Sequence, residues 1–111
     1  MASFKTNNLY VYDAGKLTVV GFGRHDVLDH VNVPQCRDEL GQLIREHECE
    51  VLAFDLTGVK LVPSGMLGLL ASLHKLGVKV ILFNPSEDMK EVLQITHLDQ
   101  FLEIDEFSLD E

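Results

Sequence analysis

The densest group of potentially reactive side chains in this chain is the segment His25-Asp26-Val27-Leu28-Asp29-His30. Histidine and aspartate are both residue types that bind transition metals. His25 and His30 are five residues apart, however, whereas two ligands on one face of a helix are three or four residues apart. The spacing favours a solvated loop and predicts no metal site. A small metal-binding protein that uses His25 and His30 is the weaker alternative.

The other side chains that could support catalysis are isolated from one another. Ser64-Gly65 follows Val62-Pro63, so the GxSxG motif of a serine nucleophile is absent from the sequence, as are GxxxxGK[ST] and GxGxxG. Asp55 ends an apolar run, where α/β proteins often bind ligands, but alone it forms no acid–base pair. Histidines 47, 74 and 97 are scattered. We therefore expect no catalytic residue, no cofactor and no enzymatic activity.

The charge of the chain restricts its partners. Nine basic residues face 18 acidic ones, which gives a formal net charge of −9. Nucleic acids and anionic membranes both attract clusters of Lys and Arg, and the sequence contains no such cluster. We therefore expect neither as a partner. The acidity serves solubility in one interpretation and complements a basic partner surface in the other.

Length, hydropathy and cysteine content place the chain among small cytoplasmic domains. No apolar run approaches the roughly 20 residues that span a bilayer, and the N-terminus lacks the apolar stretch of a secretory signal. Cys36 and Cys49 are too few for a disulfide framework and too widely spaced for a CxxC motif. We expect both to be reduced residues that pack in the core.

Hydrophobic periodicity predicts a single α/β domain over residues 1–111, with a short acidic tail at 105–111. The predicted order of elements is β-β-α-β-α-β-α-β, which gives a mixed, mostly parallel sheet packed by helices on one face or on both. The expected strands are a hairpin around a turn at 13–16, then 51–56, 78–83 and 101–104. Helices are expected after 32, after 64 and after 84.

Candidate capping residues mark the start of each helix. A proline in the first turn and a polar residue before it are typical of a helix N-terminus. On this basis the predicted N-caps are Asn32 or Val33 for the first helix, Ser64 for the second and Asn84 for the third, followed by Pro85 and Glu87. Gly77 is expected to end the second helix.

The segment from Asp55 to Leu70, Asp-Leu-Thr-Gly-Val-Lys-Leu-Val-Pro-Ser-Gly-Met-Leu-Gly-Leu-Leu, resembles the central motif of STAS domains. This family includes the bacterial anti-sigma factor antagonists. Residues 77–86 resemble the next strand and loop of the family, and residues 92–101 resemble its last helix. The resemblance spans nearly the whole chain. It implies a regulatory domain that binds a partner kinase, an anti-sigma factor or another signalling protein.

The chain departs from the family at the position that receives a phosphate. With Gly65 as the anchor, Ser64 matches the second hydroxyl position of the family motif. Pro63 stands where the family places its phosphorylated Ser or Thr, and Val62 stands where it usually has Asp. The resemblance therefore implies partner binding without the usual phosphorylation switch. Ser64 is the one candidate phosphorylation site, and a STAS-like scaffold or assembly subunit is the alternative function.

A partner surface is predicted at the end of the sheet where strands give way to loops and helices. Met66 and the Val62-Pro63 pair are expected to supply its apolar centre. The complete predicted surface consists of Arg24, His25, Asp26, Val62, Pro63, Ser64, Gly65, Met66, Asn84 and Pro85. The sequence does not predict the oligomeric state.

Overall fold

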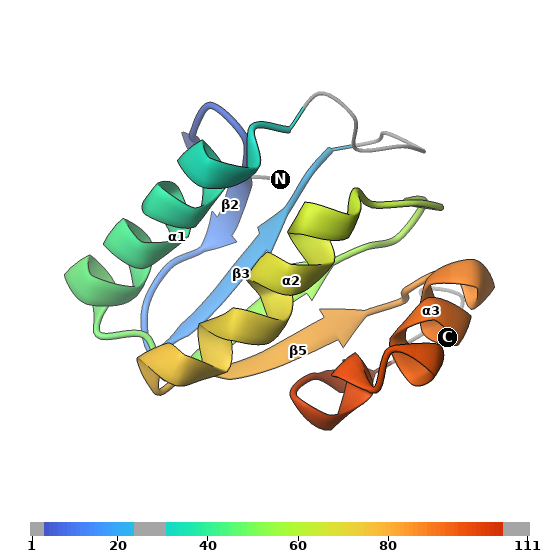
Figure 1. Cartoon of the computed structure of the whole chain (residues 1–111). Coiled ribbons are helices and arrows are strands. Elements are labelled where there is room, and N and C mark those ends of the chain that lie inside the picture. Colours follow the sequence, from blue (N-terminus) through green and yellow to red (C-terminus); the bar gives the residue numbers. More distant parts are fainter. Residues whose placement is uncertain (1–3, 24–30, 106–111) are drawn as a thin grey trace, which may run out of the picture.

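A six-stranded mixed β-sheet, with its strands in the order in which they occur in the chain, is the framework of the molecule. The computed structural model describes residues 4–23 and 31–105 (Figure 1). The strands are β1 (Phe4–Lys5), β2 (Tyr10–Asp13), β3 (Leu17–Gly21), β4 (Val51–Asp55), β5 (Lys79–Phe83) and β6 (Glu103–Asp105). The helices are α1 (Val33–His47), α2 (Ser64–Ser72) and α3 (Glu87–Ile95), with short 3-10 helices η1 (Leu73–Leu76) and η2 (Leu98–Gln100).

Strand pairing confirms the predicted α/β class and the predicted direction of the sheet. The strands β1, β2 and β3 pair in an antiparallel manner, whereas β3, β4, β5 and β6 are parallel. Each parallel pair is joined by one helix, as the alternation of apolar strand and amphipathic helix in the sequence indicates. Among the described residues, no helix has the length and apolar character needed to cross a bilayer.

The order of the strands determines on which face of the sheet the helices lie, a point that the sequence leaves open. Each crossover moves one strand further in the same direction, and crossovers of this kind are right-handed in nearly all proteins. All three helices must then lie on one face of the sheet. Figure 1 shows α1 and α2 side by side on this face, with β3 visible between them.

Burial follows the two faces of the sheet. Leu52, Phe54 and Leu82 point toward the helices and are fully buried, and Phe54 stacks on Phe22 with ring centroids 6.1 Å apart. On the opposite face Ile81 is partly exposed, whereas its neighbour Ala53 on β4 is fully buried. The core therefore lies between the sheet and its three helices.

Two predicted N-caps are wrong and one is confirmed. The Asn32 side chain accepts a hydrogen bond from the Gln35 amide, 2.9 Å away, and caps α1 as predicted. Helix α2, however, begins at Ser64 itself, with Pro63 as its N-cap. Helix α3 is capped by Ser86, whose hydroxyl accepts from the Met89 amide at 3.1 Å, and not by Asn84.

The ends of the sheet differ from the sequence prediction. The two-residue strand β1 was not predicted, because only its pairing of Phe4 with Val11 and Lys5 with Tyr10 makes it a strand. The last strand is β6, Glu103–Asp105, two residues later than the start of the predicted strand 101–104. Phe101 instead follows η2, where it stacks on His74 at 4.7 Å.

Candidate functional site

A chain of three polar side chains joins two loops at the carboxyl end of the parallel strands. Asn84, which follows β5, donates from Nδ2 to the Thr57 hydroxyl at 3.0 Å. The Thr57 hydroxyl donates in turn to Asp55 Oδ1 at 2.7 Å, and the Thr57 amide donates to the same oxygen at 3.0 Å. The sequence indicated Asp55 and Asn84 as positions of interest, but it missed Thr57, which connects them.

Backbone geometry at Asn84 explains why this residue does not cap α3. Asn84 has φ 56°, in the left-handed region that asparagine tolerates better than most residues. Its amide donates to the Asp105 carbonyl at 3.0 Å, which extends the β5–β6 pairing. The cap of α3 passes to Ser86, whose hydroxyl also donates to the Lys60 carbonyl at 2.8 Å. The loops 56–63 and 84–86 are therefore fastened together at two points.

The N-terminus of α2 is open at its surface. Ser64 and Gly65 are exposed, and Pro63 offers no side-chain acceptor to the amides of the first turn. The Pro63 carbonyl accepts from the Met66 amide at 2.9 Å, so the helix starts regularly behind it. Val33, at the start of α1, lies near Gly65. A Cβ added to Gly65 would be only 3.8 Å from a Val33 methyl group. The two helix N-termini are thus neighbours, and the unpaired amides of α2 favour an anionic group there.

The structure corrects two residues of the predicted partner surface. Met66 is fully buried and Pro85 is also buried, so neither can contact a partner. The burial of Met66 has a physical reason: Met66, Leu69, Leu70 and Leu73 recur at helical spacing and belong to the buried core. That spacing was the signal in the sequence that could have placed Met66 in the core.

An exposed leucine that the sequence analysis missed supplies the apolar surface at this end of the sheet. Leu61 is 51% exposed and precedes Val62 and Pro63, which are both partly exposed. Leu61 and Val62 line a small recess of about 30 Å³ together with Val92 of α3. We define the exposed site as Leu61, Val62, Pro63, Ser64 and Gly65 and call it the α2 entrance surface.

The remaining predicted site residues fall outside the described part of the chain. These are Arg24, His25 and Asp26 of the predicted partner surface, and His30 of the alternative metal site. In residues 4–23 and 31–105, no three side chains of His, Cys, Asp or Glu lie close enough together to hold a metal ion. His74 contacts the Ala71 carbonyl at 2.6 Å and stacks on Phe101.

Both cysteines are free thiols buried in the core, as the sequence predicts. Burial, and secondarily the charge of Glu39, raise the pKa of Cys36 to about 12. A thiol with such a pKa carries almost no thiolate at neutral pH, and the thiolate is the nucleophile. Cys36 is therefore a poor nucleophile that packs in the core.

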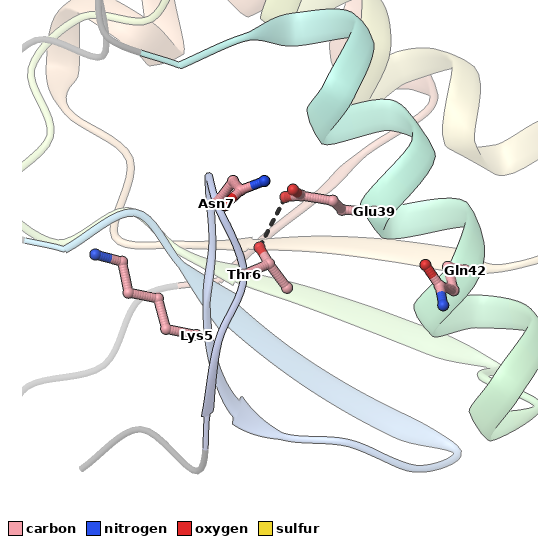
Figure 2. A pocket seen from close by; sticks show the side chains of 5 residues that line it. All are labelled: Lys5, Thr6, Asn7, Glu39 and Gln42. Carbon is pink, nitrogen blue, oxygen red and sulfur yellow. Dashed lines mark hydrogen bonds between the residues drawn. The ribbon is translucent and has the colours of Figure 1, made fainter.

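A polar hollow of about 550 Å³ lies between the β1–β2 connection and α1 (Figure 2). At its centre Glu39 accepts a hydrogen bond from the Thr6 hydroxyl at 2.7 Å. The buried Asn8 nearby in the chain donates to Gln35 at 2.9 Å and accepts from the Asn32 amide at 3.0 Å. These bonds fasten the N-terminal strands to α1. They join residues 24 to 33 positions apart, so no local pattern in the sequence predicts them.

Solved structures share this fold. The anti-sigma factor antagonist SpoIIAA in its unphosphorylated form is 19% identical over 92% of this chain and 90% of its own, with a TM-score of 0.73. The Bacillus cell fate determinant SpoIIAA in the phosphorylated form is 20% identical over 92% and 93%, with a TM-score of 0.64. The protein TM1081, solved by NMR, is 17% identical over 96% and 90%, with a TM-score of 0.68.

These likenesses define the class of the molecule: a small α/β domain with the fold of SpoIIAA. A comparison with curated proteins gives no significant match. The model of the STAS domain family, however, matches residues 25–109. The chain therefore belongs to the STAS domain family.

Proposed function

We propose that this protein is a non-enzymatic regulator of the anti-sigma factor antagonist type, which binds a protein partner through the α2 entrance surface. The partner is a kinase, an anti-sigma factor or another signalling protein. One observation carries the proposal. The segment that matches the STAS motif at Ser64-Gly65 forms an exposed helix N-terminus, beside an exposed leucine. Exposed apolar side chains next to unpaired helix amides suit a protein interface better than a substrate pocket.

The surroundings of this surface support a rigid contact. The loop that carries Leu61 is held by the Ser86–Lys60 and Asn84–Thr57 hydrogen bonds, and Pro63 fixes its own φ near −60°. A preorganised loop loses little conformational entropy when a partner binds. The partner is expected to meet a surface that already has its bound shape.

We further propose that binding is not switched by phosphorylation at the usual position. Pro63 has no hydroxyl, and Ser64 is the first residue of α2, not the residue before it. A kinase that acts on a flexible segment before the helix would find a proline with extended ψ of 150° in its place. A phosphate on Ser64 would be compatible with the fold, since it would lie at the positive end of the helix dipole. A phosphate on Ser64 is therefore the modification that would contradict this proposal.

The binding experiment compares two leucines of equal exposure. Leu61 and Leu17 are each 51% exposed, but Leu17 lies at the start of β3, at the opposite end of the strands. Protein carrying an affinity tag is used to capture partners from a lysate of its native host. We expect Leu61→Asp to lose the partner that wild-type protein captures, and Leu17→Asp to retain it. Retention by Leu61→Asp, with an unchanged melting temperature, would refute the assignment of the surface.

The phosphorylation experiment uses intact-mass spectrometry. Protein from the native host, and protein incubated with any kinase that it captures and ATP, should both show the unmodified mass. The Ser64→Ala variant should capture the same partner as wild type. A stoichiometric phosphate mapped to Ser64 would show that the switch has moved by one residue, and would contradict the proposal of constitutive binding.

A further inference from the structure

A second surface of the molecule combines positive charge with apolar side chains. A groove of about 540 Å³ runs between α1 and the end of α2 with η1. It lies toward the amino ends of the parallel strands, because η1 leads into β5 and the end of α1 leads into β4. The α2 entrance surface lies at the carboxyl ends of the same strands. The groove is therefore a separate surface.

Positive charge is concentrated in this groove. The whole chain has nine basic residues and a net charge of −9, yet Arg37, Arg45 and Lys75 all line this one groove. Asp38 is the one acidic side chain among the residues that line it. Where the structure describes the chain, none of the three cations forms an ion pair. The ion pairs found join Lys16 to Glu50, Lys79 to Glu103 and Lys90 to Glu87.

The floor of the groove is apolar. Leu69, Leu73 and Leu76 recur at helical spacing along α2 and η1 and line the groove. Leu69 and Leu73 are 1% exposed, whereas Leu76 is 56% exposed at the edge of the groove. A ligand that carries only charge would leave this leucine uncovered. The lining thus favours a ligand that has apolar and negatively charged groups together.

Gly41 gives the groove its shape on the α1 side. Arg37, Gly41 and Arg45 follow one another at intervals of four residues, so they form one stripe on α1. A Cβ on Gly41 would lie 3.2 Å from Arg45 Nη1, closer than ordinary contact, so the Arg45 guanidinium lies across the space that the glycine leaves. Glycine inside a helix is destabilising relative to alanine. Here it leaves room for the Arg45 guanidinium against the helix surface.

We propose that the α1–α2 groove is a docking site for an acidic amphipathic helix of a partner protein. Its leucines would cover Leu76, and its carboxylates would pair with Arg37, Arg45 and Lys75. Helices that dock in grooves present an apolar face of residues at i, i+3, i+4 and i+7, and Leu76 is the exposed apolar side chain in this groove that such a face would cover. Charge complementarity indicates that the docking segment is negatively charged. The cations of the groove attract an acidic segment, whereas the rest of this acidic chain repels it.

The test uses the full chain labelled with ¹⁵N and a synthetic helical peptide of about 15 residues, with leucine at the four apolar positions and glutamate at most others. We expect saturable changes of amide chemical shift confined to the groove, at residues such as Gly41 and Leu73. Binding should weaken when the salt concentration is raised from 50 to 300 mM, since exposed charges are screened. A peptide with lysine in place of each glutamate should not bind.

Matched variants connect the binding to the groove. The double variant Arg37→Gln/Arg45→Gln should weaken peptide binding about tenfold. The control Lys16→Gln/Lys60→Gln removes the same charge from exposed positions outside the groove and should leave binding unchanged. Melting temperatures show whether each variant is folded. The proposal is wrong if shift changes are absent or lie elsewhere, or if both double variants weaken binding equally. It is also wrong if inorganic phosphate occupies the groove while the acidic peptide does not.

Discussion

The role of Ser64 can be tested by comparing it with a serine that does cap a helix. The Ser86 hydroxyl accepts from the Met89 amide at 3.1 Å and donates to the Lys60 carbonyl at 2.8 Å. Ser64 is exposed in the first turn of α2, and α2 has no side-chain cap. The substitutions Ser86→Ala and Ser64→Ala each remove the same hydroxyl group. The structure predicts that they have different effects on stability.

The magnitude follows from the two hydrogen bonds of Ser86. Replacing an N-cap serine with alanine costs about 1 kcal/mol, within a range of roughly 0.5 to 2. The bond to the Lys60 carbonyl lies at the surface, so water replaces much of it and its loss adds about 0.5 kcal/mol at most. Ser86→Ala should therefore lower the free energy of unfolding by about 1 to 1.5 kcal/mol. In a domain of this size that lowers the melting temperature by about 4–8 °C.

Ser64→Ala should change the free energy of unfolding by less than about 0.5 kcal/mol, as is usual for exposed residues without a special contact. Urea titrations followed by circular dichroism at 222 nm, with the m-value checked for constancy, measure both variants against wild type. If Ser64→Ala destabilised the protein as much as Ser86→Ala, Ser64 would be the cap of α2. The assignment of Pro63 as N-cap would then be wrong.

Three further predictions concern the core. Met66→Ala should lower the free energy of unfolding by about 2–5 kcal/mol in urea titrations, because Met66 is fully buried; a loss below about 1 kcal/mol would place it at the surface. Gly21→Ala should cost about 1–3 kcal/mol by the same assay, because the new Cβ would lie 2.8 Å from Tyr12 Cε2; an unchanged stability would show that the ring moves freely. Cys36, with a pKa of about 12, should resist iodoacetamide at pH 8 until the protein unfolds. Since the unfolded thiol ionises first, its contribution to stability should fall between about pH 9 and pH 12, so urea titrations across this range should show wild type losing stability relative to Cys36→Ala.

The sequence alone was sufficient to predict features that depend on residues close together in the chain. Asn32 caps α1 as predicted, because an asparagine before a proline-containing first turn needs only the amide three residues later. The strand β4 was predicted from a continuous apolar run, and its middle residues Leu52, Ala53 and Phe54 are all fully buried. The STAS motif around Ser64-Gly65 likewise indicated the family that the comparison shows.

Other features were decided by contacts between distant segments. Asn84 looked like a helix cap in the sequence, but pairing with β6 and the hydrogen bond to Thr57 hold it in the left-handed region, and the cap moved to Ser86. Met66 looked like an interface residue, but the orientation of α2 on the sheet buries it. The order of the strands places all the helices on one face of the sheet, and no single segment of the sequence specifies that order. Local patterns specify which helices and strands form. The packing of their apolar faces determines which side chains stay exposed and can contact a partner.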